Sequence, residues 1–229
     1  MLNKIITTLK WPIALLMAWS FPASLMLFWK FISSQQYSIY NIPPILIGLF
    51  SYLVLWFFIF KRQELGSYLS TLEHECTHAL FALLTGYSVK GMHITAHDGG
   101  HVVYNGGSGN WLITIAPYFF PTITAVLLVI RLFIEQNYWL EIGIGVSIGF
   151  HLGSTYFETH GAQTDLQKAG KFFSFCFLPT ANILTYTFIG MYLQSGWRGI
   201  ISGFVFLYYS GISYSLLAYQ FFHTLLNAS

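Results

Sequence analysis

The chain has 229 residues, of which 55% are hydrophobic and only 8% are charged, and its formal net charge is +2. A soluble domain carries about 25% charged residues, so this composition indicates a polytopic membrane protein and excludes an ordinary globule. The net charge is small and no basic run is longer than Lys61-Arg62, which excludes nucleic acid as an expected partner. Cys76 and Cys176 show no pairing pattern, so neither a disulfide framework nor a cysteine metal site is expected.

Long uncharged runs predict seven transmembrane helices, each near the roughly 20 residues that a bilayer requires. These runs are 11–29, 43–60, 66–86, 110–131, 138–158, 172–195 and 199–224. Aromatic residues gather at their edges, as is typical of side chains anchored at a membrane interface. We therefore predict an all-α polytopic membrane protein that inserts as a multi-pass protein, with the lipid bilayer as its surroundings.

The segment 87–104 departs from the helical pattern. Val89 to Ala96 and His101 to Tyr104 are short β-prone stretches, and His97-Asp98-Gly99-Gly100 between them is typical of a hairpin turn. A small membrane-associated β-hairpin is therefore expected after the third span. Its strand Val102-Val103-Tyr104 would present an edge to which an extended peptide adds as a further strand, while a plain surface hairpin is the alternative.

Three histidines fall within nine residues of this hairpin, at His93, His97 and His101. They would share one face of a continuous strand, but the Gly99-Gly100 turn interrupts it. We expect exposed loop histidines here, with a structural metal site as the less favoured alternative.

The third predicted span contains the motif His74-Glu75-Cys76-Thr77-His78. Histidines at i and i+4 are separated by about 40° around a helix, so both imidazoles project from one face and can bind one metal ion. Glu75 follows His74 directly and can take a proton from a water at that metal. An ionisable cluster at membrane depth is expensive to keep without a use, which favours a functional site over a chance match.

A catalytic metal needs a third protein ligand, and the twelve residues 79–90 after the motif contain no acid. The segment 151–171 is the best source. If it is helical, His151, Glu158 and Asp165 recur every seven residues and stay within about 40° of one another on one face.

Within this stripe Asp165 is the first choice for the third ligand and His160 the second. Glu158 and His151 are better placed to donate or accept hydrogen bonds that orient ligands or substrate. The alternative for Asp165 is that it only caps or solvates the boundary before the basic residues that follow.

The motif in a membrane segment, followed by a hairpin, a proline-containing span and a distant Asp, resembles the site-2 protease family of intramembrane zinc metalloproteases. The chain is most similar to the short bacterial members without a PDZ or CBS domain, and the resemblance covers residues 66–171. Where the family has its second signature, of the Asn-Pro-x-Asp-Gly type, this chain reads Gln163-Thr164-Asp165-Leu166. Pro117 and Pro121 fit the kinked second core helix of the family.

The resemblance implies that His74, His78 and Asp165 hold one zinc ion per chain and that Glu75 is the general base. It also implies a single membrane domain over residues 1–229, with accessory spans in 1–65 and 172–229 around a catalytic core in 66–171. The expected function is zinc-dependent endoproteolysis of transmembrane or membrane-proximal segments of a membrane-protein or peptide substrate, in the inner membrane of a bacterium. The alternative is a membrane protein that binds or transports zinc without cleaving peptides.

Overall fold

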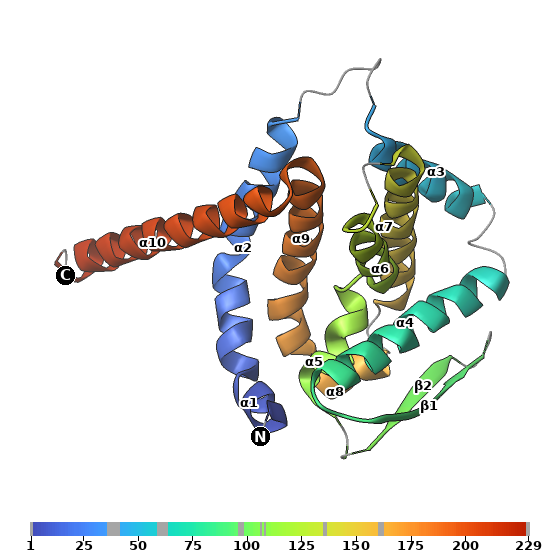
Figure 1. The fold of residues 1–229 in the computed structure, drawn as a ribbon. Coiled ribbons are helices and arrows are strands. Elements are labelled where there is room, and N and C mark those ends of the chain that lie inside the picture. Colours follow the sequence, from blue (N-terminus) through green and yellow to red (C-terminus); the bar gives the residue numbers. More distant parts are fainter. Residues whose placement is uncertain are drawn as a thin grey trace. The chain divides into compact units, whose positions relative to one another are not determined.

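The computed structural model describes residues 2–35, 42–58, 64–95, 99–105, 107, 109–134, 137–159 and 163–227, and Figure 1 shows their helices and one small sheet. The elements are α1 (Leu2–Thr8), α2 (Lys10–Ser33), α3 (Pro44–Phe58), α4 (Glu64–Leu84), β1 (Val89–Ile94), β2 (Gly100–Tyr104), α5 (Trp111–Ile115), the 3-10 helix η2 (Ala116–Tyr118), α6 (Thr122–Arg131), α7 (Tyr138–Glu158), α8 (Thr164–Ala169), α9 (Lys171–Ser195) and α10 (Trp197–Asn227).

The chain forms two compact units. Unit 1 comprises Met1–Trp11 and Tyr37–Ser174, and unit 2 comprises Pro12–Gln36 and Phe175–Ser229. The motif helix α4, the hairpin and the segment that contains Asp165 all belong to unit 1.

The described residues contain three or four candidate membrane spans by length and composition. Among the described residues, three helices are long and apolar enough to cross a bilayer: Lys10–Ser33, Lys171–Ser195 and Trp197–Leu217. A fourth is added if the bent pair Trp111–Tyr118 and Thr122–Arg131 counts as one span. The predicted total of seven is therefore not confirmed. Helix α3 has only 15 residues, and the His, Glu, Ser and Thr side chains of α4 and α7 lower their hydropathy.

The expected kink at Pro117 and Pro121 is confirmed as a full break. The two halves of this span meet at 80°. Pro117 lies in η2, and Pro121 is the N-cap residue of α6 with an extended ψ of 91°. Proline lacks an N–H and clashes with the preceding turn, so two prolines four residues apart end one helix and start another. The break leaves main-chain groups free to accept hydrogen bonds from neighbouring side chains.

Helices α3 and α7 pack through glycines with almost no side chain between them. A Cβ on Gly48 would lie 2.0 Å from the carbonyl oxygen of Ile142, and one on Gly145 would lie 2.0 Å from that of Ile45. Small residues allow this close approach, which replaces the hydrophobic driving force that lipid does not supply. The contact fixes α7, and with it Glu158 at the C-terminal end of that helix.

The predicted hairpin is present. Strands β1 and β2 pair antiparallel with His93 opposite His101, and a register irregularity follows Val89. Of the expected turn, positions 97 and 98 lie outside the described residues. Val89 and Tyr104 pack against a core that includes Phe81 at the end of α4, so the hairpin is anchored to the motif helix. His93 and His101 are both exposed, as expected of loop histidines.

Replacing Gly145 with Ala is expected to destabilise unit 1, because the new methyl group cannot fit against the main chain of α3. Overpacking of this kind costs about 1–3 kcal/mol. Thermal unfolding of the detergent-purified variant should show a lowered midpoint. Gly143→Ala is the matched control, since a Cβ there meets nothing within 4 Å. Alanine favours helix over glycine by about 0.5–1 kcal/mol, so this control should unfold at the same temperature or higher. Equal midpoints for the two variants would contradict the close approach.

Candidate metal centre

Helix α4 presents the motif side chains on one face. The His74 and His78 rings lie 4.7 Å apart between centroids and are nearly perpendicular. Both histidines and Glu75 are close to fully buried, with His74 9% and Glu75 5% exposed. The i, i+4 spacing thus places the two imidazoles side by side within the protein, as the helical geometry predicts.

Asp165 reaches both histidines from α8. Its Oδ2 atom lies 3.1 Å from His78 Nε2 and 3.3 Å from His74 Nε2. The ligand atoms of these three residues all lie within 4.8 Å of one another, so the group could hold a metal ion. Helix α8 is held in place by the buried side chains of Leu166 and Ala169.

The expectation that 151–171 forms one continuous helix is wrong. Helix α7 ends at Glu158, and Asp165 belongs to the separate helix α8, which begins at Thr164. The three residues of the predicted stripe therefore do not share a helix face. Asp165 contacts the histidines from a separate helix, and heptad spacing has no part in it.

Each histidine is oriented through its Nδ1 atom. His74 Nδ1 lies 2.6 Å from Glu158 Oε2, and Ser70 also hydrogen-bonds this carboxylate. His78 Nδ1 lies 2.8 Å from the carbonyl oxygen of Ile113 in α5. A carbonyl oxygen only accepts, so His78 Nδ1 carries the proton, and an ionised Glu158 requires the same of His74. Both Nε2 atoms then turn their lone pairs toward Asp165.

The chemistry of this donor set fits a cation. Two imidazole lone pairs and a carboxylate oxygen repel one another at these distances unless a positive charge lies among them. Hydrogen bonds at the outer nitrogen of metal-binding histidines, to a carboxylate or a main-chain carbonyl, are the usual means of fixing the tautomer. Two nitrogens and one carboxylate oxygen, with a further position open, match the ligand set of a catalytic zinc site.

The electrostatic surroundings of Asp165 keep it ionised. Burial raises the pKa of this carboxyl, but hydrogen bonding and positive charge at the His74 and His78 rings outweigh burial and hold the pKa well below its usual range. A cation bound among the three groups would supply that positive charge when both Nε2 atoms are unprotonated. Its second oxygen, Oδ1, lies 3.4 Å from Lys168 Nζ at the exposed end of the same helix. Asp165 is therefore negatively charged at neutral pH, as a metal ligand must be.

Glu75 does not take part in the His-His-Asp contacts. Its Oε2 atom is buried and has no hydrogen-bond partner among the described residues. Strand β2 covers the side chain, because a Cβ on Gly100 would lie only 2.6 Å from Glu75 Cγ. Only glycine at this position allows the strand to approach so closely. A buried carboxylate oxygen without a partner is costly, which marks Glu75 as a group with a chemical task.

The comparisons with known proteins bear on this site. The model of the Peptidase M50B-like family matches residues 45–158. The chain belongs to this family of site-2 type peptidases. No curated protein and no solved structure matches the chain. The family resemblance predicted from the motif is thereby confirmed, and together with the apolar helices it identifies an integral membrane protease.

The family match ends before α8 begins. It covers α3 to α7 and therefore the two histidines, Glu75, the hairpin and Glu158, but Asp165 lies outside it. The assignment of Asp165 as third ligand in this peptidase thus rests on its contacts with His74 and His78.

The other predicted site residues lie elsewhere. His151 is buried, and its Nε2 atom is 3.1 Å from the carbonyl oxygen of Pro117, at the broken span. There it supports the main chain of the kink and does not contact the His-His-Asp group through this nitrogen. His160, the alternative third ligand, lies outside the described residues.

One buried carboxylate near the motif carried no signal in the sequence. Glu73 is 5% exposed, and its Oε1 atom accepts from the main-chain N–H of Ile123 at 3.4 Å. Thr77 hydrogen-bonds both the Glu73 carbonyl and Thr122. Negative charge at a helix N-terminus is favourable, so Glu73 ties the start of α6 to the motif helix. Its partner is a main-chain group, which no side-chain pattern reveals.

Metal analysis of purified variants tests the ligand set. Asp165→Ala should lower metal content strongly, because it removes the only described carboxylate that contacts both histidines. Glu158→Ala leaves the ligands in place but frees the His74 ring, so it should weaken metal affinity about 10- to 100-fold. Glu141→Ala is the control, since Glu141 pairs with Arg131 instead. Loss of metal in His160→Ala but not in Asp165→Ala would transfer the ligand role to His160.

Proposed function

We propose that the chain is a zinc-dependent intramembrane endopeptidase, with His74, His78 and Asp165 as the zinc ligands and Glu75 as the general base. The observation that carries this proposal is the buried, partnerless oxygen of Glu75 beside a convergent His-His-Asp group. Its setting in a membrane peptidase family supports it. The resemblance to short bacterial members implies the inner membrane of a bacterium as its location.

Zinc bound by this group would lower the pKa of water and polarise a peptide carbonyl. Glu75 Oε2 is the free acceptor that takes the proton of the attacking water. Since the substrate nitrogen must leave as an amine, Glu75 then returns that proton to it. The carboxylate needs no rearrangement for this exchange, because its Oε2 atom has no hydrogen bond to a described residue to break.

Glu158 and Ile113 act as positioning groups. They hold the Nδ1 protons of His74 and His78, so the Nε2 atoms stay directed at Asp165. The rings cannot rotate without breaking a short hydrogen bond in a buried setting. Imidazoles preorganised by such acceptors need no reorganisation during the reaction, which favours electrostatic catalysis.

The substrate must be extended when it is cut. A transmembrane helix keeps its carbonyls in internal hydrogen bonds, so it has to unwind locally before a carbonyl is exposed to attack. Strand β2 pairs with β1 along one edge within the described two-stranded sheet. Val102, Val103 and Tyr104 on its other edge would hold the unwound segment as an added strand. Because Gly100 lies against Glu75, such a strand would run past the general base.

Glu75→Gln tests the assignment of the base. It keeps the shape of the side chain but removes the proton acceptor, so cleavage should fall by a factor of about 10²–10⁴ or more while zinc stays bound. The assay incubates detergent-purified protein with a panel of single-span membrane peptides and measures zinc in parallel. Glu141→Gln, away from the motif, should cleave at the wild-type rate.

The possible outcomes separate the candidate functions. Loss of zinc in Glu75→Gln would contradict its role as a base and make it a ligand. Zinc in both proteins with cleavage by neither would favour the zinc-binding or zinc-transport alternative. Absence of zinc from the wild type would remove the basis of both.

Gly100→Ala tests whether the strand must lie directly over Glu75. The added methyl group would displace either the Glu75 side chain or the start of β2, so cleavage should drop at least about tenfold, as a misplacement of 1 Å can cost more. Zinc content should be unchanged, because the ligands are not touched. Gly91→Ala in β1 meets nothing within 4 Å and should retain activity. Full activity in Gly100→Ala would show that the hairpin leaves Glu75 during catalysis.

A further inference from the structure

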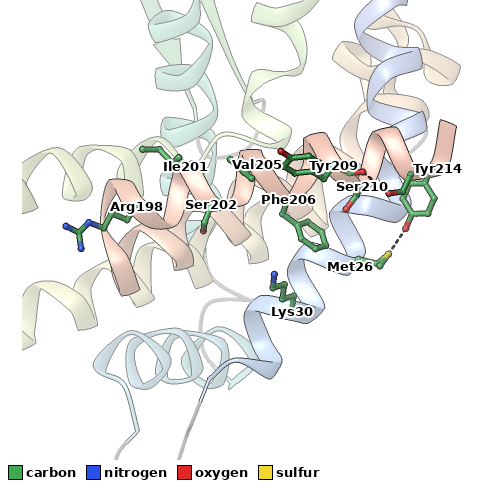
Figure 2. A pocket seen from close by; sticks show the side chains of 11 residues that line it. Met26, Lys30, Arg198, Ile201, Ser202, Val205, Phe206, Tyr209, Ser210 and Tyr214 are labelled. Atoms are coloured by element: carbon green, nitrogen blue, oxygen red, sulfur yellow. Dashed lines mark hydrogen bonds between the residues drawn. The ribbon is translucent and has the colours of Figure 1, made fainter. Parts of the chain in front are cut away.

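Unit 2 contains a groove of about 740 Å³ between α2 and α10. Every residue that lines it belongs to this unit. Figure 2 shows Lys30 and Met26 of α2 on one side, with Arg198 and Phe206 of α10 on the other. Arg198 lies at the end of this lining nearest the start of α10, and Lys30 lies farther along it, beside Phe206. The groove therefore contains two separate cations, and most of its remaining lining is apolar or aromatic.

The two cations lack an acidic counterpart in the sequence of unit 2. The segments 12–36 and 175–229 contain no Asp or Glu, and Lys30 and Arg198 are their only Lys and Arg residues. Both cations line the groove. The Lys30 ammonium lies 4.9 Å from the centroid of the Phe206 ring, so this aromatic side chain holds it over the groove. No ion pair of either cation is found within the described part of the chain, so each can bind an anion from outside it.

The sequence neighbours of both cations are typical of a membrane interface. Trp29 and Trp197, the sequence neighbours of the two cations, are 72% and 67% exposed. Trp in this position sits at the level of lipid headgroups. The amide groups of Gln35 and Gln194 hydrogen-bond each other at 3.1 Å close to these residues in the sequence. The cations therefore lie at headgroup depth, and the apolar lining lies beside the acyl chains.

The rest of the groove offers an apolar ligand surface and few free donors. Only 6% of the apolar window Trp197–Leu217 of α10 is buried within the structure. The groove hydroxyls of Ser202 and Ser213 already donate to the carbonyls of Gly199 and Tyr209. Lys30 and Arg198 are thus its charged donors, and the long flank beyond them suits hydrocarbon.

We propose that this groove binds an anionic phospholipid, with the phosphate at Lys30 and an acyl chain along Met26, Val205 and Phe206, while Arg198 adds a second positive charge farther along α10. An amphiphile of this kind is the occupant that matches both the cations and the apolar lining of the groove. A second copy of unit 2 would bring two further cations and no carboxylate side chain to the same place. The binding is a property of unit 2 and is independent of the proposed proteolysis.

Lipid binding to the purified full-length chain tests the proposal. Detergent-solubilised protein is mixed with dioleoyl phosphatidylglycerol or dioleoyl phosphatidylcholine, and bound lipid is counted by native mass spectrometry. The wild type should prefer phosphatidylglycerol, and the double variant Lys30→Gln/Arg198→Gln should lose about tenfold or more in that affinity. Lys90→Gln/Lys171→Gln changes the net charge equally outside the groove and should keep the preference.

A second variant separates the groove from its charges. Val205→Trp fills the apolar flank while both cations remain, and it should reduce phosphatidylglycerol binding; thermal melting confirms that each variant is folded. Equal loss in the Lys90/Lys171 control would overturn the proposal in favour of net charge. Full binding in Val205→Trp would overturn it in favour of a headgroup contact alone. If inorganic phosphate at equal concentration displaced phosphatidylglycerol, the site would be one for free phosphate. If a single-span peptide displaced the lipid, the groove would be a docking site for a substrate helix.

Discussion

The orientation of two imidazole rings is the constraint on which unit 1 depends. His74 and His78 can direct both Nε2 atoms at Asp165 only if their Nδ1 protons are accepted on the far side. Glu158 and the Ile113 carbonyl supply these acceptors at 2.6 Å and 2.8 Å. Helix α7 must therefore end beside α4, and α5 must turn a carbonyl toward it. The glycine contact with α3 holds α7 in the position that places Glu158 beside α4. The break before α6 allows the short helix α5 to end against the motif helix, so that the Ile113 carbonyl can face His78.

Polar groups in an apolar protein are tolerated here because nearly every one has a specific partner. Glu73 accepts from the first turn of α6, Thr77 bonds Thr122 in the same region, and His151 contacts the Pro117 carbonyl released by the kink. A buried polar group without a partner costs about 1–3 kcal/mol. Among the buried side-chain atoms without a hydrogen bond in the described part of the chain, Glu75 Oε2 is the one carboxylate oxygen, and it lies in the metal-binding motif. It is therefore the group best placed to accept a proton.

The sequence predicted what depends on local geometry. The motif helix follows from a fixed i, i+4 spacing, the hairpin from β-prone stretches around glycines, and the break from Pro117 and Pro121. The placement of Asp165 could not be predicted, because heptad spacing suggested one helix where the structure has two, with α7 ending at Glu158 and α8 beginning at Thr164. The Ile113 carbonyl and the role of Glu73 were also out of reach, since each contact involves a main-chain group. The count of seven spans is not confirmed, because α3 is short and α4 and α7 contain polar side chains that lower their hydropathy.

The Asp and Glu residues are confined to the unit that contains the proposed metal site and are absent from the unit that contains the proposed lipid groove. All eight Asp and Glu residues lie in the segment 37–174, which belongs to unit 1, and none lies in the segments of unit 2. A carboxylate is costly at membrane depth unless it binds a metal, a helix terminus or a cation. In unit 1, Asp165, Glu158, Glu73 and Glu141 each have such a partner or a histidine ligand to orient. Unit 2 has two interfacial cations and no such acids, so its natural electrostatic partner is the anionic lipid around it. A chain with this division needs no acidic residue in its second unit to complete the reaction proposed for the first.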